Sequence, residues 1–207
     1  MRKATPPAYL PTLLTDLPPE LIDALRARHA EPQRHYHDWS HVEALLRHKD
    51  SVAARLHDPD AVTLAILFHD AVYDPRASDN ERQSAALLLE YAPPVAPSTL
   101  QLAHGMVLAT DGHRMPDVSG ADAGDTAHFL DMDLAILGAH EARFDIYESQ
   151  IRREYAHVPD HAFRTGRLAV LQGFAARVQL YFSAWGRDRF EARARANLAR
   201  SIAQLGG

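Results

Sequence analysis

The sequence predicts an all-α fold built as one helical domain. Apolar residues recur three and four positions apart through most of the 207 residues, and no segment shows the regular apolar–polar alternation of a half-buried strand. Prolines and capping residues separate these periodic segments, as expected where helices begin and end. The length suits a single domain, and no repeat or low-complexity linker divides the chain.

Most expected helices are bounded by residues with a physical reason to start or stop them. Asp58 followed by Pro59 favours a helix start, because the carboxylate caps free N–H groups and proline is tolerated in the first turn. Ser78 and Glu81 have the spacing of a capping box, and the Gly-, Asp- and Ser-rich segment 111–124 predicts a loop. The expected helices cover about residues 19–29, 39–56, 58–73, 78–91, 97–110, 126–137, 140–157, 160–182 and 187–205.

The composition argues against several classes of function. The formal net charge of -5 does not favour binding to nucleic acid or to anionic membranes. The absence of cysteine excludes disulfides, thiolate zinc sites and a cysteine nucleophile, and it fits a cytoplasmic location. No apolar run approaches the roughly 18–20 residues of a membrane span. Near the N-terminus, any signal-peptide core would be interrupted by the prolines at 6, 7, 11, 18 and 19.

Histidine is frequent: the chain has 13, against only two lysines. The most informative is His69, which precedes Asp70 in the apolar segment LAILFHDAVYDP, residues 64–75. On a helix His69 shares its face with apolar and aromatic residues, so its side chain is expected to point inward. Burying such polar groups without partners is costly. This segment alone leaves two interpretations open, a metal ligand and a core histidine hydrogen-bonded to a carboxylate.

A second inward carboxylate favours the metal site. In HFLDMDLAILG, residues 128–138, Asp133 has apolar or aromatic residues three and four positions away on both sides. It therefore occupies the middle of an apolar stripe, whereas Asp131 points to a different face. Two inward carboxylates repel each other unless a cation lies between them. The periodicity therefore favours Asp133 over Asp131 as a ligand.

The third element is RHYHDWSHVEALL, residues 34–46. His37 and His41 are four positions apart and share a face if the helix begins early enough. Such a pair is a weak signal alone, because surface pairs of this kind are common. Combined with the inward His-Asp pair and the inward Asp133, each expected on a different helix, it predicts a metal centre. Nitrogen and oxygen ligands suit Mn²⁺, Mg²⁺, Fe²⁺ or Zn²⁺ without selecting among them.

These segments resemble the HD-domain superfamily of metal-dependent phosphohydrolases. One subgroup of predicted phosphohydrolases carries Arg-x-Tyr-His-x-x-x-His, then Phe-His-Asp-x-Val-Tyr-Asp-Pro, then Asp-Asn-Glu. This chain has RHYHDWSH, FHDAVYDP and DNERQSA in that order, and its FLDMDLAILG resembles the terminal aspartate element. The motifs lie within residues 34–138. The resemblance implies a single HD-type helical domain over residues 1–207, in which helices of residues 140–205 pack on the metal-site helices.

The resemblance implies that His41, His69, Asp70 and Asp133 bind the metal, although Asp131 could be aligned in place of Asp133. It implies hydrolysis of a phosphoester or phosphoanhydride of a small molecule, expected to be a nucleotide, by a metal-activated water. In such a reaction Asp70 is the candidate general base.

His37 and Glu81 are further candidate catalytic residues, the alternatives being a buried structural histidine and a simple capping role. Arg76 and Arg82 could contact phosphate, although solvated surface charge explains each of them as well.

Two other functions stay open. Some relatives of the HD superfamily oxidise their substrates, and a di-iron oxygenase of that kind would need extra ligands, for which His104 and His113 are candidates. A non-catalytic helical module could instead keep the metal as a structural element. The oligomeric state stays open as well.

Overall fold

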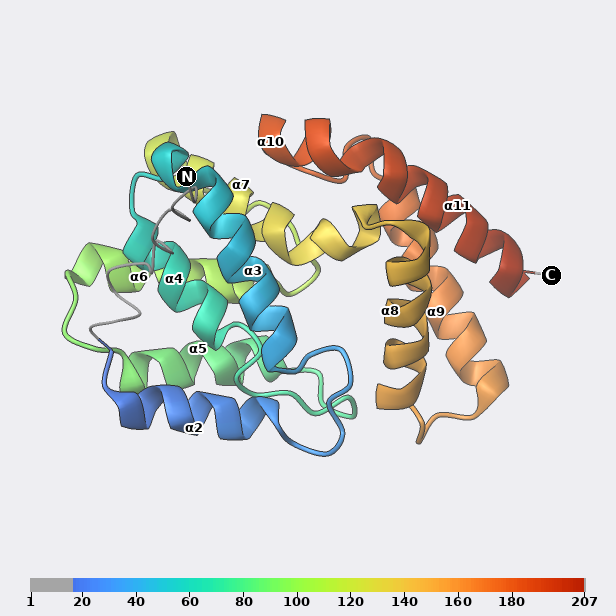
Figure 1. The fold of residues 1–207 in the computed structure, drawn as a ribbon, viewed down its shortest axis with the longest axis horizontal. Coiled ribbons are helices and arrows are strands. Elements are labelled where there is room, and N and C mark those ends of the chain that lie inside the picture. Colours follow the sequence, from blue (N-terminus) through green and yellow to red (C-terminus); the bar gives the residue numbers. More distant parts are fainter. Residues whose placement is uncertain (1–16, 207) are drawn as a thin grey trace, which may run out of the picture.

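Helix α4 (Pro59–Phe68) lies at the centre of one of the two groups of helices in the structure, a computed structural model that describes residues 17–206. Every residue from Ala61 to Phe68 is fully buried. The segment is apolar on all sides, which suits a helix that other helices surround. Four helices pack against α4 (Figure 1): α3 (Trp39–Val52), α5 (Asn80–Tyr91), α6 (Pro97–Ala109) and α7 (Gly120–Asp133).

The C-terminal helices form a second group beside this one. In Figure 1, α8 (Glu141–Glu154) and α9 (Asp160–Ala175) stand next to each other, and α11 (Ala192–Gly206) packs on α9. A 3-10 turn, η2 (Leu134–Gly138), follows α7 directly and contacts both α8 and α11. It therefore joins the two groups. The remaining elements are α2 (Pro19–His29), the 3-10 turn η1 (Ala53–Arg55), α10 (Ala184–Gly186) and the π-helical turn η3 (Arg187–Glu191).

The all-α prediction is confirmed, since residues 17–206 contain helices and no β-strand. The expected helix start at Asp58 is also confirmed: its carboxylate accepts a hydrogen bond from the N–H of Ala61, and Pro59 is the first helical residue. Over the same residues no helix has the length and apolar character needed to cross a membrane. The prolines at 6, 7 and 11, used above against a signal peptide, lie outside the described residues.

The helix expected to reach Tyr73 ends earlier, at Phe68. The guanidinium of the buried Arg34 donates hydrogen bonds to the carbonyls of Asp70 (2.6 Å) and Ala71 (3.3 Å). The hydroxyl of Ser84 accepts one from the N–H of Val72 (3.0 Å). Arg34 and Ser84 lie outside this helix in the sequence, so the spacing of apolar residues within the segment could not indicate their hydrogen bonds. They bind the backbone that a longer helix would have paired internally.

The predicted capping box of Ser78 and Glu81 is also wrong. Asp79, not Ser78, precedes the first residue of α5, and no side chain caps this helix start. The amide of Asn80 instead pairs with the backbone N–H and carbonyl of Asp74 (3.0 and 2.9 Å) and closes the loop before α5.

Helices α7 and α9 also differ from the prediction. Helix α7 begins at Gly120, within the segment expected to be a loop, and gives way to the 3-10 turn after Asp133. Helix α9 ends at Ala175 and does not continue to residue 182. There the side chain of Arg195 donates to the carbonyls of Ala175 (2.8 Å) and Arg177 (2.7 Å). A distant arginine again binds the free carbonyls of a helix end.

Gly138 of η2 packs directly against Phe190 of η3. A Cβ placed there would lie 2.5 Å from the Cβ of Phe190. We expect Gly138→Ala to lower the free energy of unfolding by about 1–3 kcal/mol, because the turn η3 must move to make room. Gly105→Ala is the matched control: no heavy atom lies within 4 Å of its added Cβ in α6, so it should be neutral or stabilising by up to about 1 kcal/mol. Urea denaturation compares the two, and equal stability would contradict this packing.

Candidate metal centre

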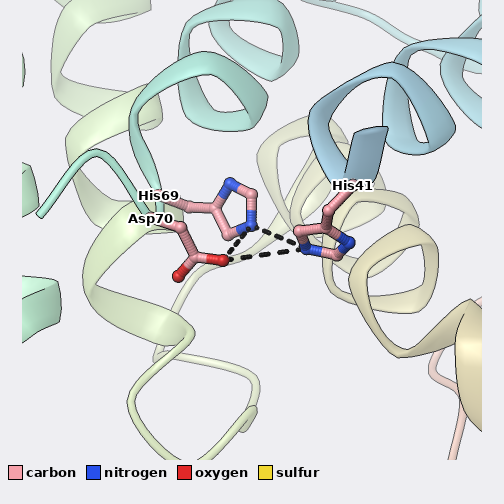
Figure 2. A group of neighbouring side chains, drawn as sticks. All are labelled: His41, His69 and Asp70. Atoms are coloured by element: carbon pink, nitrogen blue, oxygen red, sulfur yellow. Dashed lines mark hydrogen bonds and ion pairs between the residues drawn. The ribbon is translucent and has the colours of Figure 1, made fainter. Parts of the chain in front are cut away.

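Three side chains from two segments converge beside the buried end of α4 (Figure 2). His41 lies in the first turn of α3, His69 directly follows the last residue of α4, and Asp70 comes next. The Nε2 atoms of His41 and His69 are 3.1 Å apart. The Oδ2 atom of Asp70 lies 3.1 Å from Nε2 of His69 and 3.7 Å from Nε2 of His41. These three ligand atoms lie close enough together to hold a metal ion.

The spacing of these atoms fits adjacent ligands of one cation. A metal bound about 2.1 Å from each ligand separates neighbouring ligands by about 3.0 Å in octahedral and about 3.4 Å in tetrahedral geometry. The side chains of His41 and His69 are almost fully buried, whereas that of Asp70 is 19% exposed. The group therefore has a closed side towards the core and an open side at Asp70.

Asp133 lies at the same place. Its Oδ1 atom is 3.0 Å from Nε2 of His41 and 3.6 Å from Nε2 of His69. Its Oδ2 atom accepts a hydrogen bond from Nε2 of His113 at 2.7 Å. His113 has a φ of 48°, a left-handed conformation that is uncommon outside glycine. The structure thus brings His41, His69, Asp70 and Asp133 together, with His113 behind Asp133.

Asp131 is not part of this group, although it is fully buried. Its carboxylate accepts hydrogen bonds from the N–H groups of Phe182 (2.7 Å) and Ser183 (2.8 Å) and from the Ser183 hydroxyl (2.6 Å). Burial raises the pKa of Asp131 to about 6, even though these hydrogen bonds favour the charged form. Asp131 therefore holds the segment before α10 in place.

The hydrogen bonding of His69 leaves a lone pair for a cation. Its Nδ1 atom lies 2.9 Å from the carbonyl of Ile66, which can only accept, so Nδ1 carries the proton and Nε2 is free in the neutral ring. Burial by itself would lower the pKa of His69, but the carboxylates of Asp70 and Asp133 outweigh it and raise this pKa to about 9.

The carboxylates show the same electrostatic balance. Burial alone would raise the pKa values of Asp70 and Asp133. Nearby imidazoles, above all that of His69, hold both pKa values well below their usual range. The site consequently favours a positive charge among these four side chains, which a proton or a metal ion can supply.

Glu154 supports the site from α8. Its Oε1 atom accepts hydrogen bonds from the N–H groups of His35 (2.8 Å), Tyr36 (2.7 Å) and His37 (3.0 Å). Its Oε2 atom accepts from Nδ1 of His37 (2.7 Å) and from the hydroxyl of Tyr73 (2.8 Å). One buried carboxylate thus fixes both the backbone before α3 and the ring of His37.

The sequence reasoning missed Glu154 and the role of Arg34. A signal for Glu154 was present, because it continues the α8 stripe of Phe144, Tyr147 and Ile151 at spacings of three and four residues. This is the same reasoning that singled out Asp133. Arg34 had no such signal, because its importance comes from contacts with the distant turn after α4.

A cavity of about 680 Å³ opens beside the metal-site residues. Asp70 and Asp133 lie in its wall, together with His37, His113 and the second predicted catalytic residue, Glu81. Its volume is within the usual range for small-molecule sites. The other two predicted metal ligands, His41 and His69, do not line it, and neither do Arg76, Arg82 and His104, all within the described part of the chain.

The fold and this group of side chains define an all-helical protein with a candidate metal centre at a cavity. A scan against protein-family models found no match, and searches of curated proteins and of solved structures found none either. The functional argument therefore depends on the residues themselves.

Glu154 makes stability depend on pH. Burial would raise its pKa, but the hydrogen bond and charge of His37 and the backbone N–H groups outweigh it and lower the pKa from 4.5 to about 2. Because the folded value lies below the unfolded one, this stabilisation is complete above about pH 5 and is lost as the pH falls from 4.5 towards 2. A displacement of this size corresponds to roughly 3 kcal/mol.

We therefore expect Glu154→Gln to lower the free energy of unfolding by about 2–3 kcal/mol at pH 7, and the difference from wild type to shrink below pH 4. Urea denaturation across this pH range measures both values. The exposed Glu90 provides the control, because Glu90→Gln should change stability by less than about 0.5 kcal/mol. A deficit for Glu154→Gln that stays constant down to pH 2 would contradict this role.

Proposed function

We propose that the protein is a metal-dependent phosphohydrolase of the HD type that acts on a small phosphorylated molecule. A nucleotide is the substrate class that the motif resemblance implies. The observation that carries the proposal is the group of His41, His69 and Asp70, whose ligand atoms meet beside a cavity of about 680 Å³. Asp133 supports it as the fourth ligand, since its carboxylate oxygen lies 3.0 Å from Nε2 of His41.

A divalent metal held by His41, His69, Asp70 and Asp133 would lower the pKa of water and neutralise charge on the phosphoryl group. Asp70 is the general base in this proposal. It is the most exposed of these four side chains and lines the cavity, so its carboxylate can accept the proton that water loses.

His37 contributes a positive charge and a fixed orientation. Its Nδ1 atom is held by Glu154, and the ring lies in the cavity wall. Burial would lower its pKa, but the carboxylates of Asp70 and Glu154 outweigh it and raise the pKa above the ordinary value. A charged imidazole suits a phosphoryl oxygen. Glu81, in the same cavity wall, is the other candidate acid–base residue.

The oxygenase and the structural-metal alternatives differ from this proposal in measurable ways. An oxygenase needs two irons. Of its two candidate extra ligands, His113 touches Asp133, whereas His104 does not line the cavity. A structural metal predicts binding without turnover of any phosphoester.

Replacing a ligand should remove metal and activity together. We expect purified wild type to contain about one divalent metal ion per chain. Asp70→Ala and His69→Ala should each retain less than about a tenth of this and should lose phosphoester hydrolysis by about 10²–10⁴-fold. Mass spectrometry for metals and a phosphate-release assay measure the two effects. His104→Ala is the control and should keep both. A metal-loaded, active Asp70→Ala protein would refute the assignment.

Bound metal should also stabilise the fold. At a free Mn²⁺ concentration 100 times its dissociation constant, binding adds about 2.7 kcal/mol, which raises the melting temperature by roughly 5–10 °C for a chain of this size. We expect this rise in wild type and its absence in His41→Ala, as followed by circular dichroism with and without chelator. An equal rise in His41→Ala would locate the stabilising metal elsewhere.

A further inference from the structure

The cavity beside the metal centre has two chemically different walls. The wall at the metal centre is polar, as described above. The part of the lining that comes from η2, α8 and α9 is mostly apolar. Its apolar and aromatic members are Ile136, Leu137, Ile151, Phe163, Val170 and Phe174. A substrate that fills both parts has to combine a polar reacting end with an apolar remainder.

The charges in the cavity limit how many phosphate groups the substrate can carry. Among the described residues that line it, the carboxylates belong to Asp70, Glu81, Asp111 and Asp133. A divalent metal compensates only two negative charges. Multiple phosphates would need additional cations, as phosphate groups usually pair with arginine or lysine.

The one arginine in the described cavity lining, Arg167, is already engaged. Its guanidinium donates hydrogen bonds to the Tyr147 hydroxyl (2.9 Å) and to both carboxylate oxygens of Glu148. Burial would lower the pKa of Arg167, but Tyr147 and Glu148 raise it above its ordinary value, so this pair keeps its charge. Glu148 thereby neutralises the arginine.

Two more arginines lie in a neighbouring hollow. Arg114 and Arg177 line this second space, of about 660 Å³, which shares Val170 and Phe174 with the first. Arg177 is bound to the carbonyls of Gly112 (2.7 Å) and His113 (2.8 Å). Arg114 and Arg177 therefore do not line the main cavity.

From these walls and charges we propose that the substrate is a phosphomonoester of an apolar, ring-containing alcohol or phenol, with its phosphate at the metal centre and its ring against α8 and α9. This inference rests on the proposed phosphohydrolase function and names its substrate class. In the hydrolysis, the oxygen of water bonds to phosphorus and the bond from phosphorus to the alcohol oxygen breaks. Water loses a proton to Asp70, and the leaving oxygen takes this proton from Asp70, which returns to its carboxylate form.

The first test compares three substrates on the Mn²⁺-loaded wild-type protein: phenyl phosphate, glycerol 3-phosphate and ATP. We expect kcat/KM for phenyl phosphate to exceed each of the others by about 10- to 100-fold. Glycerol 3-phosphate has no ring to bury, and the extra phosphates of ATP meet the carboxylates of the cavity without cations to pair with. If ATP or glycerol 3-phosphate is hydrolysed as well or better, the substrate class is wrong while the phosphohydrolase function stands.

A pair of variants locates the ring. Val170 is 48% exposed and lines the cavity, whereas Val178 is 96% exposed and lies outside it. We expect Val170→Asp to lower kcat/KM for phenyl phosphate by a factor about 10-fold larger than that for glycerol 3-phosphate, because the added charge acts on both anions while only the phenyl ring loses its apolar contact. Val178→Asp should change neither. Equal effects of Val170→Asp on both substrates would overturn the placement of the ring.

A binding measurement separates this inference from the proposed activity. Isothermal titration of the Mn²⁺-loaded protein compares phenylphosphonate with methylphosphonate, neither of which is hydrolysed at a P–O ester bond. We expect phenylphosphonate to bind at least about 10-fold more tightly, and Val170→Asp to remove the difference. Failure to hydrolyse any ester together with this preference would refute the activity and support the apolar site. Equal affinity, or no binding of either compound, would overturn the inference.

Discussion

The structure depends on two carboxylates and two imidazoles that share a nearly closed space. Burial disfavours every charged form in this group, yet the carboxylates remain charged because the imidazoles face them, and His69 takes up positive charge in response. The group therefore favours a positive charge at its centre, which a protonated imidazole or a metal ion can supply. This balance allows polar side chains to lie directly at the end of α4, the most apolar helix in the described chain.

Hydrogen bonds from surrounding residues hold the backbone of this group in place although the two carboxylates repel each other. Arg34 binds the carbonyl of Asp70, and Glu154 binds the segment before α3 together with the ring of His37. These two residues come from different ends of the sequence and act on neighbouring parts of the backbone. Because Glu154 belongs to α8, the orientation of His37 depends on how the C-terminal helices pack. The cavity and the metal centre are therefore formed by the same contacts.

The spacing of apolar residues predicted those features of the structure that depend only on which side chains are buried. The all-α class, the inward direction of His69 and the position of Asp133 follow from which residues have apolar neighbours one turn away. Periodicity failed where a distant side chain decides the outcome. Arg34 ends α4 at Phe68, and Arg195 binds the carbonyls at the end of α9. Glu154 lies on the apolar stripe of α8, so its burial follows from the same spacing that indicates the burial of Asp133.

Asp131 and Asp133 show why burial does not define a site. The two residues are two positions apart in the sequence, and both carboxylates are almost completely shielded from solvent. Asp131 meets two backbone N–H groups and a hydroxyl, which satisfy it completely and need no ion. Asp133 meets the imidazoles of His41, His69 and His113, a set that suits a shared cation. The partners of a buried charge, and not its burial alone, therefore indicate its role.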